Sequence, residues 1–236
     1  LPPALGIGVA LAISVLIGLA IERLLFRRLI GESVFSMIMV TIGLLILMRG
    51  LVLLIWGPQE RQFPAIIPLA PLIFGDLIVP RSLAAGGIIA VVCAAGLHWF
   101  FNRSRAGLAM SAVAEDHQIA LAMGISVRRS IAFAWALGGV LSVITSMVYL
   151  SGKSLTFLSS EIGFAALPVA LLAGLESIGG LLLAGIIVGV VQGLTAAYID
   201  PLIGGNAAAV VPYIFMLVVL VVRPTGMFGW KRIERV

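Results

Sequence analysis

Residues able to do chemistry are few in this sequence, and none has a partner at a catalytic spacing. His98 ends an apolar run, and His117 follows Asp116 in a short polar passage. Neither histidine has a carboxylate or thiol placed to predict a catalytic triad. The single cysteine, Cys93, lies within an apolar run, where a buried thiol is the ordinary interpretation. The motifs of hydrolases, zinc proteases and P-loop proteins are also missing. We therefore expect no catalytic residue, no metal site and no cofactor.

The polar passage "AEDHQIALAMGI", residues Ala114–Ile125, instead has the pattern of a short capped helix. Asp116 can accept the unpaired N–H groups of a first turn, and Gly124 can end the helix in the left-handed conformation. Apolar residues fall on one face at i, i+3 and i+4: Ile119, Ala122 and Met123. A helix of about two turns is too short to be stable alone. The membrane surface or a groove on another protein must hold it, and the pattern leaves both open.

The elements that position this passage are set by an unusually apolar composition. Hydrophobic residues make up 61% of the 236 and charged residues only 11%, whereas soluble domains have about 25% charged residues. No globular core of this length buries so much apolar surface, so the solvent must be lipid. The pI of about 10.1 does not indicate nucleic acid, because the basic residues flank the apolar runs.

A helix needs about 20 apolar residues to cross a bilayer. Seven segments approach this length, the fifth of them short: about Ala4–Ile21, Ser33–Trp56, Ser82–Phe101, Ile131–Leu150, Ile162–Leu175, Gly180–Ile199 and Ala208–Val222. The expected fold is all-α, a polytopic transmembrane helical bundle. We interpret residues 1–236 as one membrane domain, truncated at its N-terminus, with a cytoplasmic loop at 102–130.

The distribution of lysine and arginine predicts the orientation of the chain. Eleven of the 15 fall in alternate connections, only Arg61, Arg81 and Lys153 fall on the other side, and Arg49 lies inside a span. Positive residues collect in cytoplasmic loops, so the loop at 102–130 and the C-terminus should be cytoplasmic. The proline-rich connection 57–81 should be an irregular, partly ordered outer loop.

Small residues at every fourth position predict where helices approach closely. Three spans carry such a stripe: Gly6-Ala10-Ser14-Gly18, Ala134-Gly138-Ser142-Ser146 and Gly185-Gly189-Gly193-Ala197. These stripes are as common in structural bundles as in transport paths. Pro168 lies inside the short fifth span and should kink it, which makes that helix a candidate gate.

The stretch "SRAGLAMSAVAEDHQIALAMGISVRRSIAFAWALGG" resembles the cytoplasmic loop of ABC-transporter permeases for branched-chain (hydrophobic) amino acids. Three more stretches resemble that family in the same order: "AIERLLFRRL", "TIGLLILMRGLVLLIWG" and "VRPTGMFG". The resemblance covers nearly the whole chain. It implies that the loop helix fits a cleft on an ATP-hydrolysing subunit, which favours docking to a protein over lying on the membrane. The expected coupling residues are Arg105, Gly107, Glu115, Asp116, Ile119, Ala120, Met123, Gly124 and Ile125.

The resemblance further implies a permease subunit of an ATP-driven amino-acid importer in a bacterial or archaeal inner membrane. Its partners would be ABC ATPase subunits, a second similar permease, an extracytoplasmic solute-binding protein and the bilayer, with no nucleic acid. Thr41, Gly43 and Pro168 are the candidates for the substrate path. Two alternatives remain at this point: a channel or secondary carrier that needs no ATP, and a membrane scaffold or intramembrane enzyme. A proton-driven carrier would usually need ionisable residues along its path, and these are scarce here.

Overall fold

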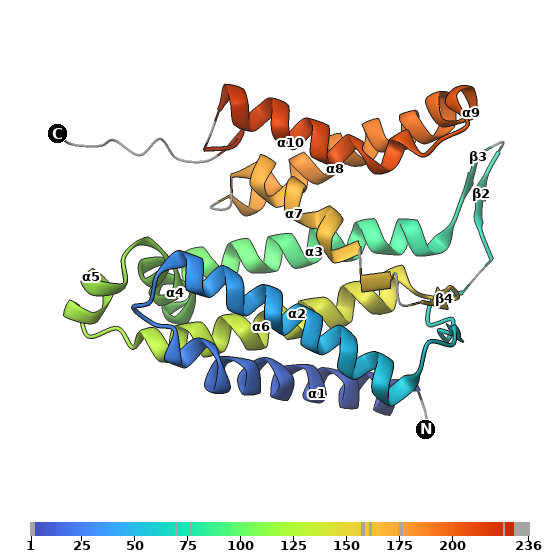
Figure 1. Cartoon of the computed structure of the whole chain (residues 1–236). Coiled ribbons are helices and arrows are strands. Elements are labelled where there is room, and N and C mark those ends of the chain that lie inside the picture. Colours follow the sequence, from blue (N-terminus) through green and yellow to red (C-terminus); the bar gives the residue numbers. More distant parts are fainter. Residues whose placement is uncertain are drawn as a thin grey trace. The chain divides into compact units, whose positions relative to one another are not determined.

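A computed structural model describes residues 3–68, 70–75, 77–156, 159–160, 162–174, 177–223 and 225–228. Helices dominate the described chain (Figure 1): α1 Pro3–Leu24, α2 Val34–Trp56, α3 Arg81–Arg103, α4 Arg105–Glu115, α5 His117–Ala122, α6 Val127–Tyr149, α7 Ile162–Ala173, α8 Ile178–Leu194, α9 Asp200–Ile203 and α10 Val211–Val222. Among the described residues, the short helical segments that join them include η1 Phe26–Arg28, η3 Thr195–Ile199 and η4 Ala207–Ala209. The strands are brief: β1 Arg61–Gln62, β2 Leu72–Phe74, β3 Leu77–Val79 and β4 Ser154–Leu155. Leu175 and the basic residues Lys231, Arg232 and Arg235, used in the predictions above, lie outside the described residues.

Five helical segments of the described chain are long and apolar enough to cross a membrane: Leu5–Arg28, Phe35–Trp56, Arg81–Arg103, Val127–Tyr149 and Ile178–Ile203. Two shorter apolar helices, Gly163–Ala173 and Val211–Val222, correspond to the fifth and seventh predicted spans. The expected all-α, polytopic helical fold is therefore confirmed. The sixth segment is longer than predicted because η3, a π-helical turn, continues α8 into α9.

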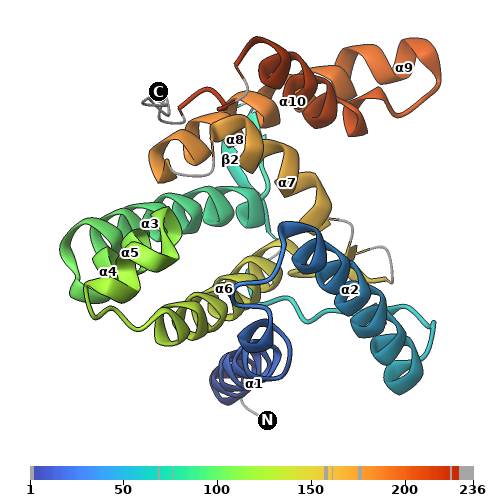
Figure 2. The same cartoon turned by 60° about the vertical axis from the view of Figure 1, so that its left-hand side comes forward.

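The chain divides into two compact units. Unit 1 holds residues 1–89 and 99–157, and unit 2 holds residues 90–98 and 158–236. The long helix α3 contributes to both units. All of the predicted cytoplasmic loop lies in unit 1, together with α1, α2 and α6 (Figure 2).

In unit 1, α1 and α6 approach each other closely through glycines. A Cβ on Gly18 would lie 2.7 Å from the Trp135 carbonyl oxygen, and one on Gly139 would lie 2.8 Å from the Ser14 carbonyl oxygen. Both distances are too short for a side chain, so two of the predicted small-residue helices do approach backbone to backbone. The two helices run antiparallel, which brings the end of α1 beside the start of α6. There the rings of Phe26 and Trp135 lie 4.6 Å apart.

At the other end of α6, the proline-rich connection is held by main-chain contacts. Strand β1 pairs antiparallel with β4, and the Phe63 N–H donates to the Lys153 carbonyl at 3.0 Å. The Ile67 N–H donates to the hydroxyl of buried Ser151 at 2.9 Å. Strands β2 and β3 form a separate antiparallel pair. The connection is thus partly ordered, as expected.

Unit 2 has its own apolar core, formed where α7, α8 and α10 meet. Its buried residues are Leu172, Ala173, Ala184 and Val188. The segment after α10 closes on the end of α7: the Met227 N–H donates to the Leu172 carbonyl at 2.8 Å. Gly226 has a φ of 81°, and a Cβ there would lie 2.6 Å from the Gly174 Cα. Part of the "VRPTGMFG" motif therefore serves a close chain contact that only glycine allows.

Candidate functional site

The short helix α5 begins at an aspartate cap. One carboxylate oxygen of Asp116 accepts hydrogen bonds from the N–H groups of Gln118 at 2.7 Å and Ile119 at 3.0 Å. Asp116 also ends the preceding helix α4, because its own N–H donates to the Ala112 carbonyl at 3.2 Å. The predicted cap of α5 is confirmed, and one residue forms the corner between the two helices.

The cap also sets the charge state of the aspartate. The N–H groups of Ile119 and Gln118 favour the ionised carboxylate, so they lower the pKa of Asp116 below its ordinary value of 3.8. Desolvation opposes this lowering of the pKa, and the electrostatic effect of neighbouring His117 adds to it. Asp116 is therefore ionised, and the cap is formed, throughout the physiological pH range.

Helix α5 ends in a Schellman motif centred on Gly124. The φ of Gly124 is 78°, and its N–H donates to the Leu121 carbonyl at 3.0 Å. The Ile125 N–H reaches back to the Ala120 carbonyl at 2.9 Å. These are the two reverse bonds of the motif, which usually comes with an apolar contact across the turn. Ala120 and Ile125 supply it, since both belong to the apolar cluster below the helix.

That cluster fixes α5 to its neighbours. Val113 of α4, Ala120 of α5 and Val127 of α6 are buried against one another, with Ala120 only 1% exposed. Three partly buried isoleucines pack around them: Ile30, Ile125 and Ile131. Ile30 comes from the turn after η1, so α5 is packed on three segments of unit 1. A helix of six residues acquires a defined position from these contacts rather than from its own propensity.

The opposite side of α5 is apolar and open. Ile119 is 61% exposed and Met123 is 72% exposed, and Leu121 and Ala122 are exposed as well. The expected apolar face of Ile119, Ala122 and Met123 is therefore presented outward. Ala120 and Ile125, predicted alongside them as coupling residues, point into the supporting cluster instead. Their contribution is to hold the helix.

Helix α4 was not expected from the sequence, which was interpreted as a loop before Ala114. The Ser104 hydroxyl accepts the Gly107 N–H at 2.9 Å and caps its start. A Cβ on Gly107 would overlap the Phe100 carbonyl oxygen and lie 2.7 Å from the Phe101 Cα, so α4 turns back closely on the end of α3. A serine at the start of an amphipathic run was the available signal.

The other two charged coupling candidates, besides Asp116, lie at the ends of α4. Arg105 is the first residue of the helix and Glu115 is the last, and both are exposed. They stand about 15 Å apart along the axis at the usual helical rise, too far for a salt bridge with each other. Of the predicted coupling residues, Ile119 lies on α5, and Asp116, Met123 and Gly124 lie at its two ends. Arg105 and Glu115 are the first and last residues of α4.

The predicted path residues lie in two different units. Thr41 and Gly43 lie on α2 in unit 1, and Pro168 lies inside α7 in unit 2. The Thr41 hydroxyl donates to the Ile38 carbonyl of its own helix at 2.7 Å. A Cβ on Gly43 would have no neighbour within 4 Å. Within the described residues, no group of three histidine, cysteine, aspartate or glutamate side chains could hold a metal ion.

Comparison with known proteins gives a consistent result over most of the chain. The family model described as "Branched-chain amino acid transport system / permease component" matches residues 1–222. The high-affinity branched-chain amino acid transport system permease protein BraD of Pseudomonas aeruginosa is 28% identical over 228 residues, covering 93% of this chain and 72% of BraD. LivH of Escherichia coli K12, a permease protein of the same description, is 28% identical over 241 residues, covering 96% and 74%.

An archaeal relative also matches. The probable branched-chain amino acid transport permease protein LivH of Methanocaldococcus jannaschii is 26% identical over 153 residues, covering 62% of this chain and 49% of that protein. No solved structure matches the chain. With its apolar helices and a family match over residues 1–222, this multi-pass membrane protein belongs to the family of permease components of branched-chain amino acid transport systems.

Proposed function

We propose that this chain is a membrane-spanning subunit of an ATP-driven ABC importer for branched-chain or other hydrophobic amino acids. The family match and the names of BraD and LivH support the substrate class. ATP is hydrolysed on separate subunits. A second homologous permease and an extracytoplasmic solute-binding protein complete the assembly in a bacterial or archaeal inner membrane.

The observation that carries this proposal is the build of α5. An isolated six-residue helix with an exposed apolar side is unfavourable in water, yet here both ends are capped and one side is packed on α4, α6 and the turn at Ile30. Such a helix can transmit a displacement without deforming. Its exposed Ile119 and Met123 are the anchors that a groove on another protein would take.

The role follows from what α5 is attached to. Ala120 packs on Val127, the first residue of α6, and Val113 links the same cluster to α4. A displacement of α5 by an ATPase subunit therefore acts directly on the start of α6, a helix long enough to cross the membrane. Glycine contacts at Gly18 and Gly139 pass the movement of α6 to α1. Coupling thus runs through packed backbone rather than through a flexible loop.

Orientation is part of the same proposal. The arginines at the end of α1, in η1 and at the start of α6 mark this end of unit 1 as cytoplasmic. The C-terminus lies on that side as well. Substrate passes near Thr41 and Gly43 of α2, with Pro168 in α7 as the gate.

The test uses the complete assembly in proteoliposomes, with the solute-binding protein and radiolabelled leucine outside and ATP inside. We expect uptake that requires ATP hydrolysis. Replacing Ile119→Glu and Met123→Glu together should abolish both uptake and capture of the ATPase subunits, because charges would be buried in an apolar groove. The matched control is Ile73→Glu, an equally apolar side chain, 68% exposed, in the connection after α2. Uptake without ATP would instead identify a secondary carrier.

A further inference from the structure

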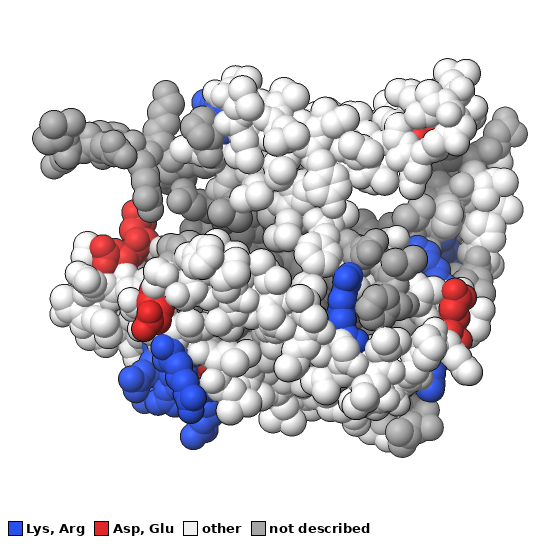
Figure 3. Space-filling model, viewed as in Figure 1, with Lys and Arg blue, Asp and Glu red and all other residues white. Residues whose placement is uncertain are grey.

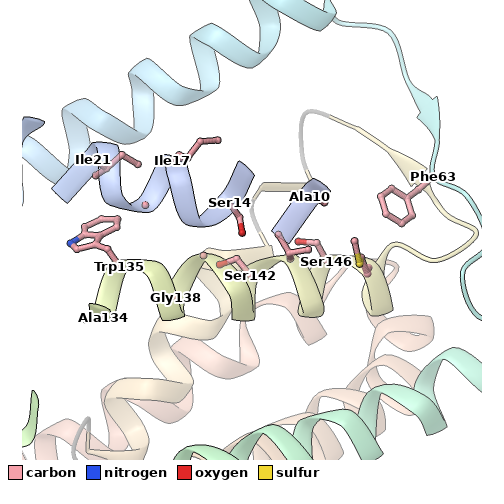
Figure 4. A pocket seen from close by; sticks show the side chains of 14 residues that line it. Ala10, Ser14, Ile17, Ile21, Phe63, Ala134, Trp135, Gly138, Ser142 and Ser146 are labelled. Carbon is pink, nitrogen blue, oxygen red and sulfur yellow. The ribbon is translucent and has the colours of Figure 1, made fainter. Parts of the chain in front are cut away.

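A groove of about 740 Å³ runs along the α1–α6 pair of unit 1. Ile21 and Trp135 lie at its cytoplasmic end and Phe63 at the other (Figure 4). Between them the lining is apolar except for serine hydroxyls, among them Ser14 and Ser142. None of the described lining residues carries a negative charge, so the lining offers no ion-pair partner for the ammonium group of an amino acid. It is therefore a poor candidate for the substrate site.

The dimensions of the groove suit a hydrocarbon chain. Its α1 wall extends from Ala10 to Ile21, which is about 17 Å at the usual helical rise. One leaflet accounts for about half of the roughly 30 Å hydrocarbon layer, so the groove is as long as one leaflet is deep. The groove is open at Gly138, where an added Cβ would meet nothing within 4 Å. A flexible, unbranched chain fills such a groove without requiring a polar partner.

Five arginines stand at the cytoplasmic end of this groove: Arg23, Arg27, Arg28, Arg128 and Arg129. The first three come from the end of α1 and from η1, and the other two from the first turn of α6. All five are exposed, and none forms an ion pair with a carboxylate among the described residues. Figure 3 shows the basic side chains gathered over this end of the helix pair. So dense and unpaired a cluster has the charge to hold an anionic phosphate group.

We propose that the α1–α6 pair binds one anionic phospholipid, with its phosphate among these arginines and an acyl chain in the groove. Two independent features select this ligand. A partner helix could fill the groove without contacting the arginines, and a free phosphate could bind the arginines without filling the groove. Only a lipid with a negative headgroup matches both. Because the start of α6 also supports α5, this lipid would sit beneath the helix proposed to contact the ATPase.

Trp135 lines the groove near its charged end, so its fluorescence can report the acyl chain. The experiment uses the full chain in detergent with Trp56, Trp99 and Trp230 replaced by phenylalanine. Quenching is compared for brominated dioleoyl phosphatidylglycerol and the matching phosphatidylcholine. We expect at least about fivefold tighter quenching by phosphatidylglycerol, the gain typical of one arginine beside an anionic headgroup. Equal quenching by the two lipids would overturn the proposal.

Further variants distinguish binding of the lipid headgroup from binding of the acyl chain. Replacing Arg128→Gln and Arg129→Gln together should bring the two lipids to near parity, whereas Arg103→Gln with Arg105→Gln, which removes the same charge at the α3–α4 junction, should leave the preference intact. Gly138→Leu fills the groove and should reduce quenching by either lipid. Equal losses in the two arginine pairs would reveal only a general surface attraction. Undiminished quenching in Gly138→Leu would show that the chain does not occupy the groove.

Discussion

The contact between α1 and α6 allows a comparison of two neighbouring glycines that undergo the same substitution. A Cβ at Gly139 would lie 2.8 Å from the Ser14 carbonyl oxygen, whereas ordinary contact begins at 3.4 Å. In Gly139→Ala the two backbones must therefore separate by about 0.6 Å, the difference between those distances. A Cβ at Gly138 would meet nothing within 4 Å. Gly138→Ala should leave the contact unchanged.

The magnitude follows from packing. A gap of 0.5–1 Å forfeits about a quarter to a half of the dispersion energy at a contact, and forcing an extra carbon into a packed interface costs about 1–3 kcal/mol. Both variants gain the same helix propensity, about 1 kcal/mol for alanine over glycine. That gain cancels in the comparison, so Gly139→Ala should be less stable than Gly138→Ala by about 1–3 kcal/mol.

The assay is unfolding in mixed micelles of dodecyl maltoside with increasing sodium dodecyl sulfate, followed by the circular dichroism of the full chain. The unfolding midpoint for Gly139→Ala should fall at a lower mole fraction of dodecyl sulfate than the unfolding midpoint for Gly138→Ala. The reasoning is wrong if the two midpoints coincide or if their order is reversed, because α1 and α6 would then not approach through Gly139.

Three other predictions concern single residues. Gly107→Ala should displace α4 from the end of α3, since the new Cβ would overlap the Phe100 carbonyl oxygen; faster tryptic cleavage between the two helices would show it, and unchanged cleavage would contradict it. Gly226→Ala should detach the segment after α10 from Gly174, because it adds both a clash and the cost, about 1–2 kcal/mol, of a left-handed alanine; a lower thermal midpoint is expected, and an unchanged one would argue against the contact. The pKa of the Asp116 carboxyl is lowered by its backbone hydrogen bonds. The cap therefore stabilises α5 fully above pH 3.8, and this stabilisation is lost as the pH falls through the lower pKa of the folded state. The carboxyl carbon resonance should titrate with a midpoint below 3.8, and a midpoint at or above it would rule out the cap.

Local signals in the sequence were sufficient to predict α5. An aspartate three residues before the first apolar position and a glycine after the last one correspond directly to the hydrogen bonds found at Asp116 and Gly124. The seven apolar segments were equally readable, because length and composition decide whether a helix can cross lipid. The boundary between α8 and α9 was not, since a π-helical turn leaves no mark on hydropathy.

Long-range contacts were the part that the sequence could not supply. Small-residue stripes predicted close approach at Gly18 and Ser14 but not which helix each would meet. The inward direction of Ala120 and Ile125 also escaped prediction, because it depends on Val127 packing beneath them. Helix α4 was missed because its glycine lowers helix propensity, and the reason for that glycine is the nearby end of α3.

The most direct test of the central claim is site-specific photo-crosslinking in the assembled transporter. Benzoyl-phenylalanine replaces Met123, the C-cap residue of α5, whose side chain is 72% exposed, and in a parallel protein it replaces Ile73. Irradiation should join position 123 to an ATPase subunit and leave position 73 unlinked to it. Crosslinking of position 123 to lipid alone, with the ATPase present and active, would mean that α5 lies on the membrane and does not carry the coupling.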